Sequence, residues 1–303
     1  PCATSKLTPS SATMPPKPGS DLPSQWTHRP SSVLKFAPGA TVDEIDTDAT
    51  PGFTGRQEDA AAIQTERNAR FAGLQEMLYA NGKEGDRRSV LLVLQGMDTA
   101  GKGGIVEDVV GAGSPTGIRY TSFGKPTDEE RAHHFLWRIS KALPPAGHIG
   151  VFDRSHYEDV LVVRVHNLVP PSEWEPRYDE ITTFEAELAD AGTVLVKVAL
   201  FVSLEEQRRR LAERLERPEK YWKYNPGDLE ERKLWPAYQE AYQAMLERTS
   251  TERAPWYVVP CDKKWYSRLA VTELLIEALK GLDLSWPPPD FDVEAEKRKL
   301  AGL

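Results

Sequence analysis

The sequence contains only two cysteines, Cys2 and Cys261, among 303 residues. Two cysteines cannot form a disulfide framework, and this fits a reducing compartment such as the cytosol. No apolar run approaches the length of a transmembrane helix, and the N-terminal residues lack the apolar core of a signal peptide. We therefore expect a cytoplasmic protein with no membrane partner.

The chain is also short of positive charge. It has 38 Lys and Arg against 46 Asp and Glu, a net charge of −8. A surface of this sign repels polyanions, so nucleic acid is not an expected partner, and any polyanion site must be a local cluster of Lys and Arg. Hydrophobic residues make up 40% of the chain, as in ordinary globular proteins.

Turn-forming and polar residues dominate the first part of the chain. Residues 1–32 are rich in Pro, Ser and Thr, and we predict that they form a disordered tail. Residues 33–285 then read as one domain, followed by a C-terminal extension at 286–303.

Within that domain, short apolar runs alternate with segments of helical periodicity. The runs predict five strands, at residues 89–95, 117–123, 148–153, 193–202 and 256–260. Helices are predicted at 57–80 and 267–280, and capping boxes at Thr127/Glu130 and Ser203/Glu206 begin two more. This alternation predicts an α/β fold with a parallel sheet covered on both faces, which binds ligands at the carboxyl ends of its strands.

The segment "GMDTAGKGG" (96–104) has the outline of a phosphate-binding loop between a strand and a helix, with Gly96, Gly101 and Lys102 in the required places. The usual Ser or Thr after the lysine, which would hold Mg²⁺, is missing, and Gly103 takes its place. Asp98 lies inside the loop, where a carboxylate would repel phosphate unless a cation lay between them. We therefore predict that Asp98 holds the metal, the alternative being that it caps backbone amides.

A second carboxylate, Asp153, ends the apolar run "HIGVFD" at the same expected edge of the sheet. In phosphate-loop folds a second acidic residue meets the metal here. Arg154 follows and could contact phosphate with both guanidinium nitrogens, although an Asp–Arg pair of purely structural role remains possible.

Residues 207–223 hold seven Lys and Arg against three Glu. On a helix, Arg210, Arg214 and Arg217 fall on one stripe, which predicts a phosphate-facing lid at about 204–233. The alternative is a solvated helix laced with Glu–Arg pairs such as Glu206–Arg210 and Glu213–Arg217, which contribute little.

Together these motifs resemble the polyphosphate kinase 2 family over residues 33 to 285. The resemblance rests on G-x-D-x-x-G-K-x-G at 96–104, on D-R-S-x-Y at 153–157, and on the lid pattern from Gln207 to Lys223. Leu211 stands where many members carry Phe, and the N-terminal tail has no counterpart.

The resemblance implies a three-layer α/β/α kinase fold, similar to thymidylate kinase, with a helical lid. It also implies reversible transfer of phosphoryl groups between inorganic polyphosphate and nucleotides, AMP to ADP and ADP to ATP, with Mg²⁺ or Mn²⁺. The nucleotides are expected to carry adenine, with guanine left open, and the chain to form a homo-oligomer.

The same resemblance assigns site residues. The metal carboxylates are Asp98 and Asp153, and the other catalytic residues are Lys102, Arg154, Arg210 and Arg214. We expect the substrate to be bound by residues of the loop and by scattered cations: Gly96, Ala100, Gly101, Gly103, Gly104, Lys125, Arg138, Arg164, Lys220 and Lys223.

Two other functions use the same motifs. An ATP-dependent nucleoside or nucleotide kinase is disfavoured by Asp98 and Gly103. A non-catalytic module that binds polyphosphate or nucleotides is disfavoured by Asp153, Arg154 and the lid stripe.

Overall fold

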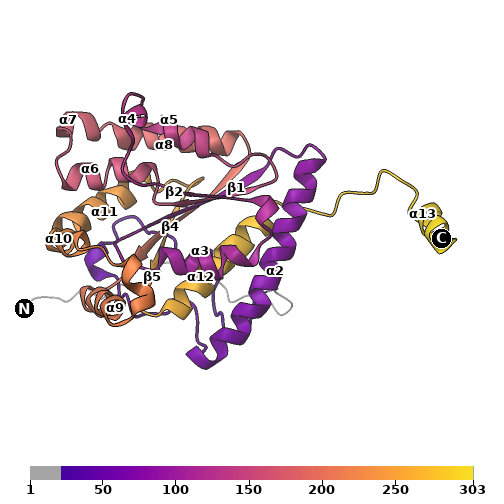
Figure 1. The fold of residues 1–303 in the computed structure, drawn as a ribbon, viewed down its shortest axis with the longest axis horizontal. Helices are drawn as coiled ribbons and strands as arrows, with labels where there is room; N and C mark the ends of the chain where they lie inside the picture. Colours follow the sequence, from indigo (N-terminus) through magenta and orange to yellow (C-terminus); the bar gives the residue numbers. More distant parts are fainter. Residues whose placement is uncertain (1–21, 303) are drawn as a thin grey trace, which may run out of the picture.

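The computed structural model describes residues 22–302 and forms three layers (Figure 1). The central sheet has five parallel strands in the order β2-β3-β1-β4-β5. Their bounds are Ser89–Gly96 (β1), Ile118–Ser122 (β2), Ile149–Asp153 (β3), Thr193–Phe201 (β4) and Trp256–Pro260 (β5). All five strands are confirmed. The inner strands β1, β3 and β4 are largely buried apolar runs, as expected in a parallel sheet, whereas β2 lies at an edge and is partly exposed.

One face of the sheet packs against two long helices. The elements on this side are α1 (Pro30–Val33), α2 (Gln57–Lys83), α3 (Lys102–Asp108), η2 (Val110–Ala112), η3 (Pro115–Gly117) and α12 (Lys264–Gly281). Alternate residues of β1, such as Val90, Leu92 and Leu94, are buried here against Phe71 and Leu78 of α2.

The other face is covered by α8 (Arg177–Asp190) and α11 (Trp235–Thr249), which lie together with several shorter elements (Figure 1). These are η1 (Val42–Glu44), α4 (Asp128–Arg131), α5 (Leu136–Ala142), η4 (His156–Asp159), α6 (Val162–Val165) and α7 (Pro171–Trp174). Leu91 and Val93 of β1 point to this side, as the two-residue period of a strand requires.

The lid segment follows β4. It consists of α9 (Leu204–Glu216), η5 (Pro218–Lys223) and α10 (Gly227–Lys233). Ser203 accepts a hydrogen bond from the backbone N–H of Glu206 and so caps α9, whereas the Glu206 carboxylate, which would complete the predicted capping box, pairs with Arg209 and Arg210.

The sequence predicts one helix from Thr127 that stops at Pro144 and Pro145, but the structure divides it. The capping box is present, but α4 ends at Arg131 and a new helix, α5, begins at Leu136.

The predicted disordered tail, residues 1–32, was wrong for its last part, because Trp26 is only 1% exposed and packs against Phe53 and Tyr266. Residues 1–21 lie outside the described residues.

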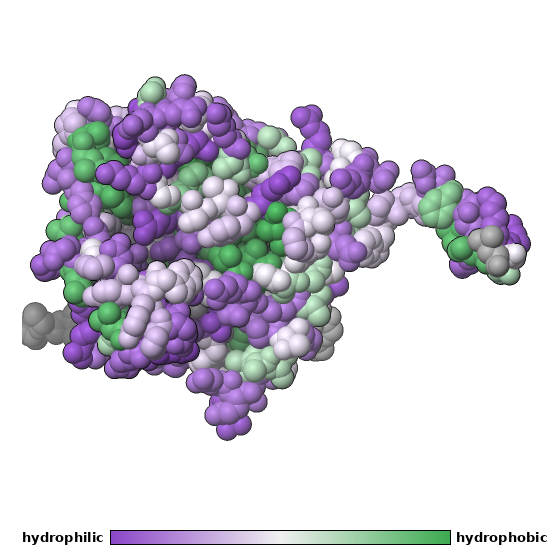
Figure 2. Space-filling model, in the orientation of Figure 1, coloured by the Kyte–Doolittle hydropathy of each residue, from purple (hydrophilic) through white to green (hydrophobic). Residues whose placement is uncertain are grey.

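At the other end, the C-terminal extension stands away from the body (Figures 1 and 2). It ends in α13 (Val293–Ala301), and Trp286, Phe291 and Leu300 are exposed along it. No helix among residues 22–302 is both long and apolar enough to cross a membrane.

Candidate active site

The loop between β1 and α3 has the backbone shape that an anion site needs. Thr99 and Gly101 adopt the left-handed conformation, with φ of 67° and 115°. Successive N–H groups can then turn toward one point, and α3 begins directly afterwards at Lys102. At Gly96 a Cβ would lie 2.9 Å from the backbone oxygen of Leu200, so only glycine fits between the two strands.

Lys102 is folded across this loop. Its ammonium donates to the carbonyl oxygen of Gly96 at 2.6 Å and lies 3.5 Å from that of Met97. The ammonium is therefore directed at the carbonyl oxygens of the strand end, and its contact with phosphate stays a prediction.

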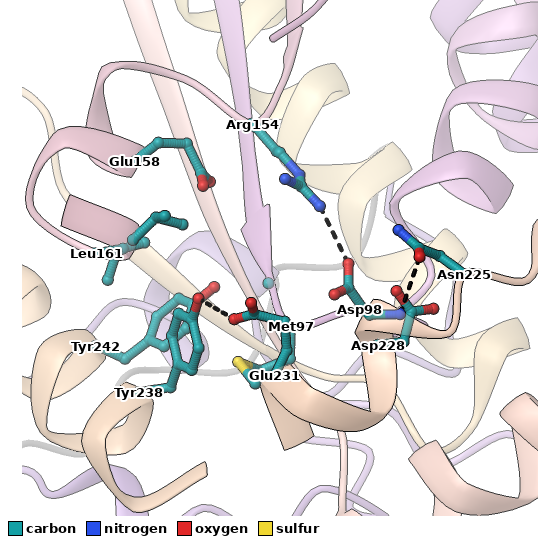
Figure 3. Close-up of a pocket in the computed structure, with 13 residues that line it drawn as sticks. Met97, Asp98, Arg154, Glu158, Leu161, Asn225, Asp228, Glu231, Tyr238 and Tyr242 are labelled. Atoms are coloured by element: carbon teal, nitrogen blue, oxygen red, sulfur yellow. Dashed lines mark hydrogen bonds and ion pairs between the residues drawn. The ribbon is translucent and has the colours of Figure 1, made fainter. Parts of the chain in front are cut away.

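Asp98 and Arg154 form an ion pair across two neighbouring strands, with 3.1 Å between guanidinium nitrogen and carboxylate oxygen (Figure 3). Arg154 has a φ of 65°, and its backbone N–H donates to the carbonyl oxygen of Leu94, which fixes the turn after β3. Burial opposes its charge, but Glu158 and Asp98 outweigh this effect and raise the pKa of Arg154. The arginine is therefore held as a cation at the sheet edge.

Asp153 ends β3 directly beside β1, where its Cα pairs with that of Leu94. One carboxylate oxygen accepts a hydrogen bond from the Tyr120 hydroxyl at 3.3 Å. Asp98 and Asp153 thus lie at the carboxyl ends of adjacent strands, as predicted. Within residues 22–302 no group of three or more His, Cys, Asp or Glu side chains could hold a metal alone.

A cavity of about 240 Å³ opens beside the loop, on the α11 side of the sheet. Figure 3 shows that Asp98, Arg154, Glu158, Glu231, Tyr238 and Tyr242 surround it. Glu158 accepts from Gln95, and Glu231 accepts from the Tyr238 hydroxyl at 2.6 Å. Burial and the Glu158 carboxylate raise the pKa of Tyr242, which keeps this phenol neutral.

Most residues that line this cavity were not predicted from the sequence. Glu158 adjoins the D-R-S-x-Y motif, and Tyr238 and Tyr242 are one helical turn apart on α11, a spacing that could have marked them as one face. Nothing in the sequence near Asp228 or Glu231 distinguishes them from other acids of a solvated helix.

Arg210 is buried, with 4% of its surface exposed. It pairs with Glu206 at 2.7 Å, and its other nitrogens donate to the carbonyl oxygens of Thr99, Cys261 and Asp262 at 2.8, 2.5 and 3.1 Å. It therefore ties the lid to the phosphate loop and to the end of β5. Both Glu–Arg pairs of the alternative interpretation are present, since Glu213 also lies 3.3 Å from Arg217.

Arg214 lies closer to the cavity. It donates to the carbonyl oxygen of Lys223 and pairs with Asp228 at 3.2 Å. Burial, and then the nearby Asp98 carboxylate, raise the pKa of Asp228, although Arg214 opposes the shift. An anion that approached Arg214 would therefore compete with the Asp228 carboxylate, whose charged form is only weakly stabilised.

The other predicted substrate contacts are dispersed. Lys220 pairs with Glu213 within the lid segment, and Lys223 lies 3.6 Å from Glu107 of α3, the helix that follows the phosphate loop. Arg138 donates to the carbonyl oxygen of Gly124 and lies over the Phe123 ring, while Lys125 is exposed on the same connection. Arg164 donates to the Tyr178 hydroxyl and lies over the Trp174 ring, within the helical layer.

The small residues of the loop differ in their surroundings. Ala100 is buried and closes a turn with Met97. A Cβ at Gly103 would meet no heavy atom within 4 Å, whereas at Gly104 it would lie 3.2 Å from the Arg268 guanidinium. Space beside Gly103 is therefore open.

Beneath the D-R-S-x-Y turn is a fully buried polar cluster. Lys197 of β4 donates to Glu185 at 2.6 Å and to the Tyr157 hydroxyl at 3.0 Å. Tyr157 donates to Glu185 as well, and His156 lies 3.2 Å from the same carboxylate. This cluster anchors the turn that carries Arg154.

Comparison with known proteins points to one family. Residues 55–285 match the family described as polyphosphate kinase 2. An "AMP/ADP-polyphosphate phosphotransferase" from Meiothermus ruber is 49% identical over 246 residues, which cover 81% of this chain and 91% of that protein. An "ADP-polyphosphate phosphotransferase" from Rhodopseudomonas palustris is 40% identical over 253 residues, covering 80% of this chain and 86% of that one.

A solved structure supports the same family assignment. A crystal structure of polyphosphate kinase 2 from Arthrobacter aurescens TC1 superimposes with a TM-score of 0.89 and 51% identity, covering 92% of this chain and 98% of that one.

Proposed function

The chain belongs to the polyphosphate kinase 2 family, with its phosphate-loop kinase fold, and on that premise we propose that it transfers phosphoryl groups between inorganic polyphosphate and AMP or ADP. The observation that carries the proposal is the position of the Asp98–Arg154 pair. It lies between the phosphate loop and a cavity lined by acids and tyrosines.

The cavity suits the nucleoside part of the acceptor. Met97, Leu161 and Val162 offer apolar contacts, while Glu158 and Glu231 offer hydrogen-bond acceptors to hydroxyl or amino groups. The phosphates of the nucleotide would then point toward Arg154 and Arg214.

The two carboxylates at the sheet edge fit a divalent metal. Mg²⁺ typically takes one or two protein carboxylates and fills its remaining positions with water and phosphate oxygens. Asp98 and Asp153 match this donor set, and Mn²⁺ has the same preference for oxygen. When bound, the metal would neutralise charge on the phosphate oxygens.

Catalysis then rests on position and charge. One phosphoanhydride bond breaks and another forms, and the attacking phosphate oxygen is already ionised, so the reaction needs no general base and should be reversible. Lys102 and the loop N–H groups hold the transferring group, and Arg154 stabilises charge that develops on it. Direct contact of Arg210 with this group stays a prediction, because its guanidinium nitrogens already donate to the carbonyl oxygens of Thr99 and Cys261.

Incubation with ADP, long-chain polyphosphate and Mg²⁺, without ATP, tests the function. We expect ATP to form. If the protein instead uses ATP to phosphorylate a nucleoside or nucleoside monophosphate and ignores polyphosphate, it is an ordinary kinase of the same fold. Binding of polyphosphate without turnover would make it a binding module.

Three finer features also belong to this proposal. The free thiol of Cys261, buried beyond β5, supports a cytosolic location. Use of guanine nucleotides follows if the two acids of the cavity also accept guanine N–H groups. A homo-oligomer is supported by the exposed Trp286, Phe291 and Leu300 of the C-terminal extension, and light scattering of the full chain and of one truncated after 285 tests it.

A further inference from the structure

Tyr120 of the edge strand β2 reaches the candidate site from outside the motifs that define it. Its hydroxyl donates a hydrogen bond to the Asp153 carboxylate at 3.3 Å. In the register of β2 with β3, Tyr120 lies opposite Val151, whereas Ser122 lies opposite Asp153. The phenol therefore extends along the sheet by two residues, a diagonal that aromatic side chains can span.

Tyr120 and Asp153 belong to the face of the sheet that α2 and α3 cover. Residues that lie opposite each other on paired strands point to the same face. Val151, the partner of Tyr120, is buried on this face. Leu94, the partner of Asp153, is buried there as well. The cavity opens instead on the α11 side, so a change at Tyr120 can be made without altering the cavity wall.

The backbone around Asp153 is fixed on two sides. Its carbonyl oxygen accepts a hydrogen bond from the N–H of Phe123 at 3.0 Å, and the N–H of the next residue, Arg154, donates to the carbonyl oxygen of Leu94 at 3.0 Å. The remaining freedom lies in rotation of the carboxylate about its side-chain bonds. The Tyr120 hydroxyl restricts this rotation, because it engages one carboxylate oxygen and leaves the other to face a cation.

The phenol is suited to donate in this contact. Partial burial raises the pKa of Tyr120, and the Asp153 carboxylate raises it further, although a hydrogen bond with Ser122 opposes the shift. The hydroxyl therefore keeps its proton at neutral pH. Carboxylates that bind metals are themselves held by such hydrogen bonds, and loss of one of these partners typically weakens metal affinity or activity by about 10- to 100-fold.

A structural role is the alternative, because Tyr120 is 50% exposed and its ring covers part of the sheet edge. In that role the ring stabilises the fold and the hydroxyl has no effect on the metal. The two roles are separable, since Tyr120→Phe keeps the ring and removes only the hydroxyl.

We propose that Tyr120 is a positioning residue whose hydroxyl orients the Asp153 carboxylate toward the divalent metal of the reaction. This role rests on the proposed function, since it takes Asp153 as a metal ligand. It makes the affinity for the metal, and not the affinity for the nucleotide, the property that Tyr120 controls.

The test measures metal binding separately from turnover. Binding of Mn²⁺ to the nucleotide-free full chain is followed by the electron paramagnetic resonance signal of the free ion, in wild type, Tyr120→Phe, Asp153→Asn and the double variant. ATP formation from ADP and long-chain polyphosphate then gives the half-saturating Mg²⁺ concentration. Tyr79→Phe is the matched control, because the Tyr79 ring packs edge-to-face on His148, which precedes β3 at the opposite end of the sheet.

We expect the Kd for Mn²⁺ and the half-saturating Mg²⁺ concentration to rise about tenfold or more in Tyr120→Phe. KM for ADP should stay near the wild-type value, kcat should largely recover at saturating Mg²⁺, and the melting temperature should change by less than about 2 °C. In the Asp153→Asn background, Tyr120→Phe should weaken Mn²⁺ binding little further, because the two residues act through one carboxylate. Tyr79→Phe should change none of these values.

Unchanged Mn²⁺ affinity in Tyr120→Phe would overturn the positioning role, as would an equal loss of affinity in the presence and absence of the Asp153 carboxylate. Absence of Mn²⁺ binding by wild type would overturn it as well. A wild-type protein that binds Mn²⁺ in a Tyr120-dependent way but forms no ATP from polyphosphate would keep the positioning role and lose the proposed function. An active enzyme whose metal affinity is indifferent to Tyr120→Phe is the opposite result.

Discussion

Substitution of Arg210 distinguishes two roles for this residue: support of the phosphate loop, or direct contact with the substrate. Its guanidinium is buried and donates hydrogen bonds to Glu206 and to the carbonyl oxygens of Thr99, Cys261 and Asp262. Arg210→Ala removes three charge-assisted hydrogen bonds from carbonyl oxygens, one of them buried and two partly buried, and each is worth about 1.5–3 kcal/mol before relaxation. Water can enter part of the space, so we expect a loss of about 3–5 kcal/mol.

For a protein of this size such a loss lowers the melting temperature by roughly 5–10 °C. Calorimetry of Arg210→Ala should show this shift together with a steep loss of kcat, because Thr99 and the loop lose their support. The control is Arg209→Ala, since Arg209 is 58% exposed and its pair with Glu206 contributes at most about 1 kcal/mol. A loss of kcat with a melting temperature within about 1 °C of wild type would refute the reasoning. It would show that Arg210 leaves these carbonyls to bind substrate.

Three further predictions concern the carboxylates and the buried pair. Asp153→Asn should abolish most turnover at saturating Mg²⁺ with a nearly unchanged melting temperature, because its side chain lies at the exposed sheet edge; unchanged kcat would exclude it as a metal ligand. Glu185→Gln and Lys197→Met should each cost about 3–5 kcal/mol in urea unfolding, because each leaves a buried charge unpaired, while the double variant should regain much of the loss. Strict additivity of the two losses would contradict the pairing. Since burial, and then Asp98, raise the pKa of Asp228, the native state binds this proton more tightly than the unfolded chain does. Stability relative to Asp228→Asn should therefore fall as pH rises from 3.8 through the raised pKa, and parallel curves of melting temperature against pH would contradict this.

The strands and the phosphate loop were predictable from the sequence because short-range patterns determine them. The apolar run at 89–95 can be satisfied only by burial on both faces, and it leads directly into Gly96. Asp98 and Asp153 followed from the same logic, since the ends of parallel strands meet at one edge. The capping box at Thr127 likewise fixed the start of α4.

The sequence could not predict which residues form hydrogen bonds or ion pairs with each cation. A helical stripe places Arg210 and Arg214 on one face, but only the tertiary fold shows that Thr99 and Cys261 lie opposite Arg210, and Asp228 opposite Arg214. Arg164 was unpredictable for the same reason, because its partners lie in α7 and α8. Trp26 was assigned to the tail since a single aromatic residue in a Pro-rich segment carries no periodic signal.

The central claim is that polyphosphate, not ATP, supplies the phosphoryl group through the site at Asp98 and Asp153. The direct measurement is a time course with AMP, long-chain polyphosphate and Mg²⁺ in the absence of ATP, run with wild type and with Asp153→Asn. We predict that wild type produces ADP first and ATP afterwards, while the variant produces almost none of either. Formation of neither product by a wild-type protein that still transfers phosphoryl groups from added ATP would contradict the account.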